Sequence, residues 1–169
     1  MSIRFIDCPV FLSKFYVGKL SKIVPGLEIN TEELGPSEML RLVEHCEFVM
    51  NDHTYMDPEF LAHCKSLKSI VFMGTGASSF IDIPAAKSQG IRVRTIKGYG
   101  DRSVAEHAIA LMFSAGRRVV EMDRSIRQGE WATLNSMEFR GKRLGVVGTG
   151  GIGSEVIKIG AALGLEVLA

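Results

Sequence analysis

Short apolar runs alternate with segments of helical periodicity along the whole chain. Five runs have the length and composition of buried strands: Ile3–Cys8, Leu27–Asn30, Phe48–Asn51, Ser69–Met73 and Arg92–Ile96. The segments between them favour helices near Val10–Ser21, Ser37–Glu44, Pro58–Cys64 and Pro84–Ser88. This alternation is typical of a parallel sheet covered by crossover helices, so the pattern predicts an α/β fold.

Several residues mark where the expected helices begin and end. Asp57 stands before Pro58, which places a capping carboxylate ahead of a proline at the first helical position. Pro36 and Pro84 stand where two other helices can begin. Gly90 lies between a helical segment and the next strand, where glycine is a common helix C-cap.

The pattern changes after Ile96, where a glycine-containing loop begins. Ser103 and Glu106 then have the spacing of a capping box. A long apolar stripe follows, and Gly129 is its expected stop, which predicts a single helix of about 25 residues, or about 37 Å. A helix of that length is expected to leave a first domain, residues 1–97, and to enter a second, residues 98–169.

A glycine motif lies near the end of the sequence. Leu144–Gly148 has the pattern of an apolar strand and runs into the G-x-G-x-x-G element of residues 148–153. Ser154–Leu163 continues as an amphipathic helix, and Leu165–Ala169 begins another strand. Strand, glycine turn, helix and strand together form a dinucleotide-binding fingerprint.

Each residue of this turn has an expected role in binding a dinucleotide. Gly148 permits the tight turn, Gly150 lets the backbone approach a pyrophosphate, and Gly153 lets helix and strand pack closely. The free backbone N–H groups of Gly151 and Ile152 would face the phosphates at the positive end of the helix dipole. A glycine-rich turn that binds no ligand is the alternative.

Charge and hydropathy exclude other classes of protein. The formal net charge is +1, so the chain lacks the excess of basic residues that is typical of a dedicated nucleic-acid binder. No apolar run approaches the ~20 residues of a membrane span, and the first residues lack the pattern of an export signal. We therefore expect a cytoplasmic protein that binds neither nucleic acid nor membrane.

Three cysteines, Cys8, Cys46 and Cys64, cannot all pair within the chain, which favours a reducing compartment. The pairs His45-Cys46 and His63-Cys64 place neighbouring side chains poorly for one tetrahedral ion. Packing in the core and at helix ends explains them better than zinc, so no metal site is expected.

A set of short motifs follows in a fixed order along the second half of the chain. They are Gly74–Ala77 with Ile81-Asp82, Gly90-Ile91, Ser103–His107, Arg117-Arg118, Gly129–Trp131, Arg140–Lys142 and the glycine motif. Together they resemble the D-isomer-specific 2-hydroxyacid dehydrogenases, the family of phosphoglycerate, glycerate and hydroxypyruvate dehydrogenases. The resemblance runs from about Leu67 to Ala169, and residues 1–66 match only in their alternating pattern.

The resemblance implies a flavodoxin-like substrate domain followed by the first β-α-β of a Rossmann NAD-binding domain. Gly74, Thr75 and Gly76 match the turn whose amides face substrate and nicotinamide, so Thr75 is also a cofactor candidate. Exposed N–H groups after a buried strand suit a carboxylate independently, although a tight turn alone is the alternative. The implied ligands are NAD or NADP, with NAD favoured, and a small 2-hydroxy or 2-keto acid; the implied assembly of the complete protein is a homodimer.

Hydride transfer also needs a cation for the substrate carboxylate and an acid/base group. In the family these are an arginine, a glutamate and a histidine beyond the second strand of the nucleotide domain. None of the four histidines here stands in a matching position, so no catalytic residue is assigned. The acidic residue that binds the ribose is expected about two residues past Ala169. Many members of the family carry a polar or basic residue at the position of Phe72, so the identity of the substrate stays open.

Two hypotheses about the whole protein follow. The first is that the sequence is the amino-terminal part of a 2-hydroxyacid dehydrogenase, because only one β-α-β of the nucleotide domain is present. The second is a non-catalytic nucleotide-binding or regulatory module that pairs with a full-length relative. We favour the first, because an unfinished sheet makes a poor end for a domain.

Overall fold

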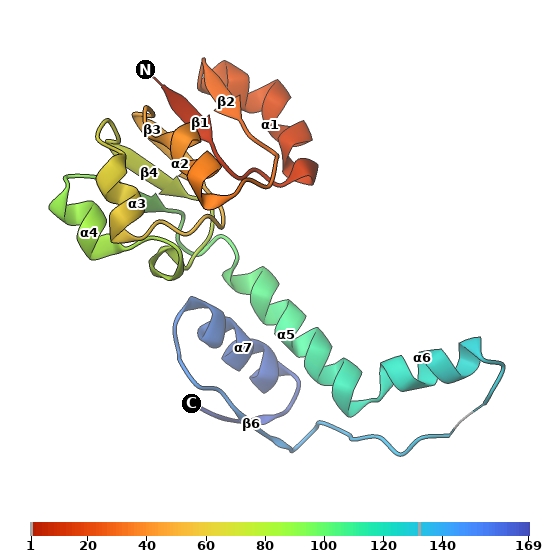
Figure 1. Cartoon of the computed structure of the whole chain (residues 1–169). Helices are drawn as coiled ribbons and strands as arrows, with labels where there is room; N and C mark the ends of the chain where they lie inside the picture. The colour runs from red at the N-terminus through yellow and green to blue at the C-terminus, as the bar shows by residue number, and fades with distance from the viewer. Residues whose placement is uncertain (1, 132) are drawn as a thin grey trace. The chain divides into compact units, whose positions relative to one another are not determined.

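The computed structural model describes residues 2–131 and 133–169, and these form two compact units (Figure 1). The first unit comprises residues 1–97 and the second residues 98–169.

The first unit is built on a five-stranded sheet in which every strand pair is parallel. Its strands are β1 (Ile3–Phe5), β2 (Leu27–Ile29), β3 (Phe48–Asn51), β4 (Ser69–Phe72) and β5 (Arg92–Thr95), in the order β2-β1-β3-β4-β5. This is the flavodoxin-like order, with its reversal between β1 and β3, and it confirms the predicted fold class.

Helices cover both faces of this sheet, because each central strand has apolar residues on both sides. The helices are α1 (Val10–Ile23), α2 (Pro36–Val43), α3 (Pro58–His63) and α4 (Ile83–Ser88), with a short 3-10 helix, η1 (Ala77–Ser79). Val49 of β3 packs in the core shared with α2, α3 and α4, whereas the next residue, Met50, packs with Leu12 and Tyr16 of α1. Cys46 and Cys64 lie in the larger core.

The predicted helix signals act as expected at two positions. Asp57 caps α3 by accepting a hydrogen bond from the Phe60 N–H at 2.7 Å. Gly90 follows α4 with φ +75°, the left-handed conformation that glycine adopts without strain. The start of α4 differs from expectation, because Asp82 is its N-cap and the helix begins one residue before Pro84.

The second unit contains a parallel two-stranded sheet with a helix between its strands. Its elements are α5 (Asp101–Gly116), α6 (Val119–Arg127), β6 (Arg143–Gly145), α7 (Gly151–Ala162) and β7 (Glu166–Leu168). Gly160 of α7 is buried, and a Cβ there would lie 2.7 Å from a Leu144 methyl carbon. The predicted first β-α-β of a Rossmann domain is therefore confirmed, with α7 closely packed on its strands.

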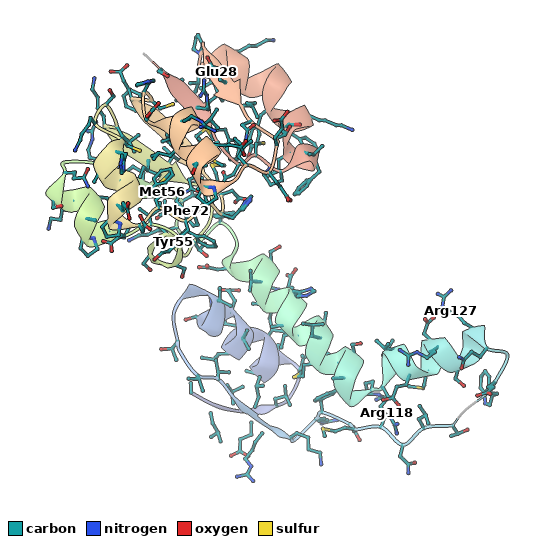
Figure 2. The ribbon with its side chains drawn as sticks, viewed as in Figure 1. Glu28, Tyr55, Met56, Phe72, Arg118 and Arg127 are labelled. Atoms are coloured by element: carbon teal, nitrogen blue, oxygen red, sulfur yellow. The ribbon has the colours of Figure 1, made fainter. Side chains whose placement is uncertain are left out.

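The prediction of one long helix between Ser103 and Gly129 is wrong. Arg118 has φ +54°, a left-handed residue that separates α5 from α6 (Figures 1 and 2). The Met137 N–H donates to the Gly116 carbonyl at the end of α5, at 2.9 Å. Phe139 packs on Phe113 with ring centroids 4.8 Å apart. A Cβ on Gly116 would overlap the Phe139 ring, so glycine allows this close approach. The returning chain thus occupies the end of α5.

The predicted capping box is also wrong. Gly100 is the N-cap and α5 begins at Asp101, so Ser103 lies inside the helix. Gly129, in contrast, follows the last turn of α6 with φ +80° and ends that helix as expected. Within the described residues, no helix has the length and hydropathy needed to cross a bilayer.

Candidate functional site

The glycine turn between β6 and α7 is shaped by two of its glycines. Gly148 has φ +93°, which glycine alone adopts readily. A Cβ on Gly153 would overlap the carbonyl oxygen of Gly148, so only glycine allows the helix to approach the turn. The Ser154 hydroxyl donates to the Thr149 carbonyl at 2.9 Å and ties the first turn of α7 to the loop.

Gly150 has a different environment, which is open. It is the N-cap of α7 in an extended conformation, and no side chain caps the helix from that position. A Cβ built on Gly150 would meet nothing within 4 Å. The backbone N–H groups that begin α7 therefore face space that a ligand can occupy, at the positive end of the helix dipole.

A cavity of about 460 Å³ lies in front of this turn. Its lining residues are Asp101, Val146, Val147, Gly148, Gly150, Gly151, Ile152, Gly153 and Val156. All five predicted residues of the turn, residues 148 and 150–153, are among them. The lining supplies apolar walls, backbone N–H groups and, among these described residues, one formal charge, the carboxylate of Asp101.

Ion pairs hold α5 against α7 beside this cavity. Arg102 of α5 donates to Glu106 at 2.7 Å and to Glu155 of α7 at 3.1 Å. Lys158 donates to the other oxygen of Glu155 at 2.6 Å. The hydrogen bond from Lys158, followed by that from Arg102, lowers the pKa of Glu155 below its ordinary value.

The predicted substrate turn, Gly74 to Gly76, lies at the carboxyl end of β4. Thr75 and Gly76 are exposed, so their backbone groups are accessible. A Cβ on Gly74 would lie 2.7 Å from Cε1 of Phe72, so glycine is needed to accommodate that ring. Phe72 is 1% exposed and stacks on Phe80 with centroids 5.4 Å apart, which makes it a core residue (Figure 2).

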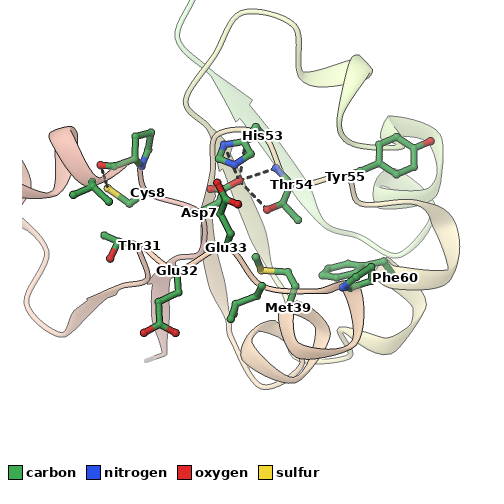
Figure 3. Close-up of a pocket in the computed structure, with 14 residues that line it drawn as sticks. Asp7, Cys8, Thr31, Glu32, Glu33, Met39, His53, Thr54, Tyr55 and Phe60 are labelled. Carbon is green, nitrogen blue, oxygen red and sulfur yellow. Dashed lines mark hydrogen bonds and ion pairs between the residues drawn. The ribbon is translucent and has the colours of Figure 1, made fainter.

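A second cavity, of about 510 Å³, lies at the carboxyl ends of β1, β2 and β3 (Figure 3). Its lining residues are Asp7, Cys8, Pro9, Val10, Thr31, Glu32, Glu33, Leu34, Pro36, Met39, His53, Thr54, Tyr55 and Phe60. None of the residues predicted from the sequence to bind substrate or cofactor lines this cavity. It lies where the strand order reverses, which is where ligands bind in open parallel sheets.

Asp7 organises one wall of this second cavity. It is 6% exposed, and its carboxylate accepts hydrogen bonds from the N–H groups of Asp52, His53 and Thr54 at 2.7–2.9 Å. The Thr54 hydroxyl donates to it as well, at 2.8 Å. The His53 Nδ1 lies 3.7 Å from a carboxylate oxygen of Asp7 (Figure 3). It also lies 3.5 Å from a carboxylate oxygen of Asp52, so two carboxylates lie near the imidazole.

The cysteines are packed as thiols. Burial raises the pKa of Cys8, and the neighbouring charges of Asp7 and Asp52 raise it further, so this thiol is a poor nucleophile. Burial likewise raises the pKa of Cys64 to about 11. The thiols of Cys46 and Cys64 donate to the carbonyls of Leu42 and Phe60, each at 3.4 Å. Among described residues, no group of three or more His, Cys, Asp or Glu side chains could hold a metal.

A flavodoxin-like sheet and a β-α-β unit with an open glycine turn define a class of protein that pairs a parallel α/β domain with a dinucleotide-binding fold. Residues 109–169 match the model of the D-isomer specific 2-hydroxyacid dehydrogenase, NAD binding domain. Residues 109–169 are thus similar to the NAD binding domain of this family, and the chain is similar to curated members of the D-isomer specific 2-hydroxyacid dehydrogenases.

Two curated relatives illustrate the match. The D-3-phosphoglycerate dehydrogenase of Archaeoglobus fulgidus is 40% identical over 148 residues, which cover 85% of this chain and 28% of the relative. The hydroxypyruvate reductase of Thermotoga maritima is 33% identical over 146 residues, covering 85% of this chain and 47% of the relative. The chain therefore spans less than half the length of these relatives.

Solved structures agree in fold. An acyclic imino acid reductase in complex with NADPH and D-Arg matches with a TM-score of 0.86 at 25% identity, over 98% of this chain and 54% of that chain. A D-lactate dehydrogenase from Aquifex aeolicus, complexed with NAD and lactic acid, matches with a TM-score of 0.81 at 25% identity, over 99% and 50%.

Proposed function

We propose that this chain is part of an NAD-dependent oxidoreductase that transfers a hydride between nicotinamide and a small 2-hydroxy or 2-keto acid. The observation that carries the proposal is the uncapped start of α7, with Gly150 open to the cavity within a family NAD binding domain. In this account Gly148, Gly150, Gly151, Ile152 and Gly153 bind the cofactor pyrophosphate through backbone N–H groups. NAD is preferred to NADP in the proposal, in line with the family description.

Residues 1–97 are assigned to the substrate in this proposal, and residues 98–169 to the cofactor. Gly74, Thr75 and Gly76 would bind the substrate carboxylate, with Thr75 also close to the nicotinamide. The exposure of Thr75 and Gly76 at the carboxyl end of a buried parallel strand supports this role.

The acid/base and the carboxylate-binding cation are assigned to a part of the protein outside residues 1–169. The family resemblance implies an arginine, a glutamate and a histidine for these tasks, and no residue of this chain matches them. Single groups of this kind contribute ~10²–10⁴-fold, so residues 1–169 alone should give no measurable turnover. Reading the coding DNA beyond Ala169 tests the assignment, and a stop codon there would contradict it.

Calorimetric titration with NADH tests the cofactor site. Backbone and helix-dipole contacts to phosphate supply about 1–3 kcal/mol, so residues 1–169 should bind NADH only at millimolar concentration. Gly150→Val should abolish this binding, because its side chain would fill the space that the pyrophosphate needs. Gly18→Val is the matched control, since Gly18 also has nothing within 4 Å of its Cβ position but lies in α1. Unchanged binding by the Gly150 variant would contradict the site.

The proposed partner is a second copy of the chain. The helix α6 and the segment after it expose apolar side chains, among them Val119, Val120, Ile126 and Trp131, the last of which is 88% exposed. A helix of nine residues is marginal in water without a packing partner, which supports contact through this surface. Sedimentation should give a dimer that Val120→Asp disrupts; a wild-type monomer would contradict the homodimer.

The alternative, a module that pairs with a full-length relative, would use the same exposed surface. A test for co-purification of such a relative with the native chain distinguishes a pairing module from part of a dehydrogenase. Recovery of the relative would favour the module, whereas recovery of a single polypeptide would favour the dehydrogenase part.

A further inference from the structure

Asp101 lies where two helices begin. It is the first residue of α5, and its carboxylate packs against Gly151, the first residue of α7. A Cβ on Gly151 would overlap Oδ2 and Cγ of this carboxylate. The close approach explains why glycine stands at position 151, a position that the dinucleotide fingerprint leaves free.

The electrostatic environment of this carboxylate is that of an anion site. The N-terminus of each helix carries about half a positive charge, and those of α5 and α7 lie together beside Asp101. Arg102, the next residue of α5, forms an ion pair with Glu155, one turn further along α7, and this pair holds the two starts in position. An internal carboxylate therefore already lies close to the N–H groups that the proposed function assigns to pyrophosphate.

No opposing charge is available among the residues that line this cavity. The other described lining residues are glycines, valines and Ile152, so Asp101 gives the cavity its only formal charge, and that charge is negative. Like charges a few ångströms apart repel each other strongly where water is partly excluded. A bound phosphate and the Asp101 carboxylate would compete for the same two helix ends.

We propose that Asp101 sets the affinity of the glycine turn for phosphate: its carboxylate competes with the pyrophosphate of the ligand and is displaced when the ligand binds. The inference rests on the proposed function and adds a residue that opposes binding. Asp101 is neither a catalytic group nor part of the glycine motif.

Titration with charged and uncharged ligands tests this inference. The ligands are inorganic pyrophosphate, ADP-ribose and adenosine, added to wild-type protein and to Asp101→Asn and Asp101→Ser variants. We expect both variants to bind pyrophosphate and ADP-ribose about 10-fold more tightly than wild type at low salt, with the difference shrinking at high salt. Adenosine binding, which involves no phosphate, should not change.

Asp123→Asn is the matched control, because it removes one negative charge from an ion pair with Arg127 on α6, outside the cavity. Thermal unfolding followed by circular dichroism checks that each variant is folded. Two different substitutions at position 101 are used so that the test remains possible if one of them does not fold. Equal tightening by Asp123→Asn would overturn the inference, since the effect would then reflect net charge alone.

The remaining outcomes separate this inference from the proposed function. Suppose that wild type binds the phosphate ligands, that Gly150→Val does not, and that the position-101 variants bind no more tightly than wild type. Asp101 then does not compete with the ligand, so the inference fails while the proposed cofactor site is supported. Weaker ADP-ribose binding with unchanged pyrophosphate binding would also overturn it, because Asp101 would then hold a ribose. If no variant binds any phosphate ligand at millimolar concentration, the site itself is absent and both proposals fail.

Discussion

At the scale of single residues, Asp7 joins the end of β1 to the loop after β3. One buried carboxylate accepts three backbone N–H groups and one hydroxyl, which fixes residues 52–54 along the wall of the cavity. A carboxylate is well suited to this place because it is an acceptor only and offers two oxygens. The residue thus stabilises a loop through hydrogen bonds.

Asp7→Asn should destabilise the protein by about 3 kcal/mol. The amide nitrogen of asparagine cannot accept hydrogen bonds, so at least one buried backbone N–H loses its partner. Chemical denaturation monitored by circular dichroism measures the change. Glu32→Gln is the control, since Glu32 is an exposed carboxylate of the same cavity. Equal stability of the two variants would show that the hydrogen bonds to Asp7 contribute little.

At the scale of elements, the contact between α5 and α7 depends on charge as well as packing. Hydrogen bonds from Lys158 and Arg102 lower the pKa of Glu155 from its ordinary value of 4.5. A carboxyl whose pKa is lower in the folded state stabilises that state above the unfolded pKa. The stabilisation is lost as the pH falls through the lower, folded value.

Glu155→Gln should therefore lower the unfolding midpoint at pH 7 and have a diminishing effect as the pH falls below about 4.5. Denaturation of both proteins between pH 3 and pH 7 measures this difference. Glu138→Gln, at an exposed carboxylate outside this set of ion pairs, should leave the profile unchanged. A difference that grows in acid would contradict the assigned pKa direction.

Individual elements also show which parts of the fold could be predicted from the sequence. The bounds of β3 match the predicted Phe48–Asn51, because a buried parallel strand is a continuous apolar run. The division of the long helix was missed because the apolar periodicity continues through Arg118, and one left-handed residue leaves no trace in that pattern. The close approach of Phe139 to Gly116 joins segments more than twenty residues apart, which local patterns do not predict.

One part of the candidate site could likewise be predicted from the sequence, and another part could not. The glycine turn was predictable because its residues are consecutive, and because glycine is needed at Gly148 for its positive φ and at Gly153 for close packing. The cavity around Asp7 was missed because its walls come from three strands whose order becomes clear only in the folded sheet. The available signal was a polar residue at the carboxyl end of a predicted strand: Asp7 near the end of Ile3–Cys8 and Asp52 directly after Phe48–Asn51.

At the scale of the whole molecule, the two units differ in how much apolar material they bury. Residues 1–97 bury a large core that includes Phe5, Ile70 and Phe72, whereas residues 98–169 bury few apolar side chains, among them Ile109 and Leu165. Burial of apolar surface is the main source of folding free energy. The first unit should therefore fold independently of the second.

Residues 1–97 alone should show the circular dichroism of an α/β protein and a cooperative thermal transition. Residues 98–169 alone should melt without a sharp transition, because a two-stranded sheet with one covering helix is marginal. The same scan on both pieces makes the comparison. A featureless, non-cooperative trace from residues 1–97 would contradict the independence of the first unit.

In the whole protein, the start of α7 is proposed to hold the phosphates of a dinucleotide. Amide NMR spectra of isotopically labelled protein, recorded while NADH is added to millimolar concentration, test it most directly. The largest shifts should occur at the N–H groups of Gly151 and Ile152, with smaller ones at their neighbours in the turn. Shifts confined to the cavity around Asp7, or no shifts at the start of α7, would contradict it.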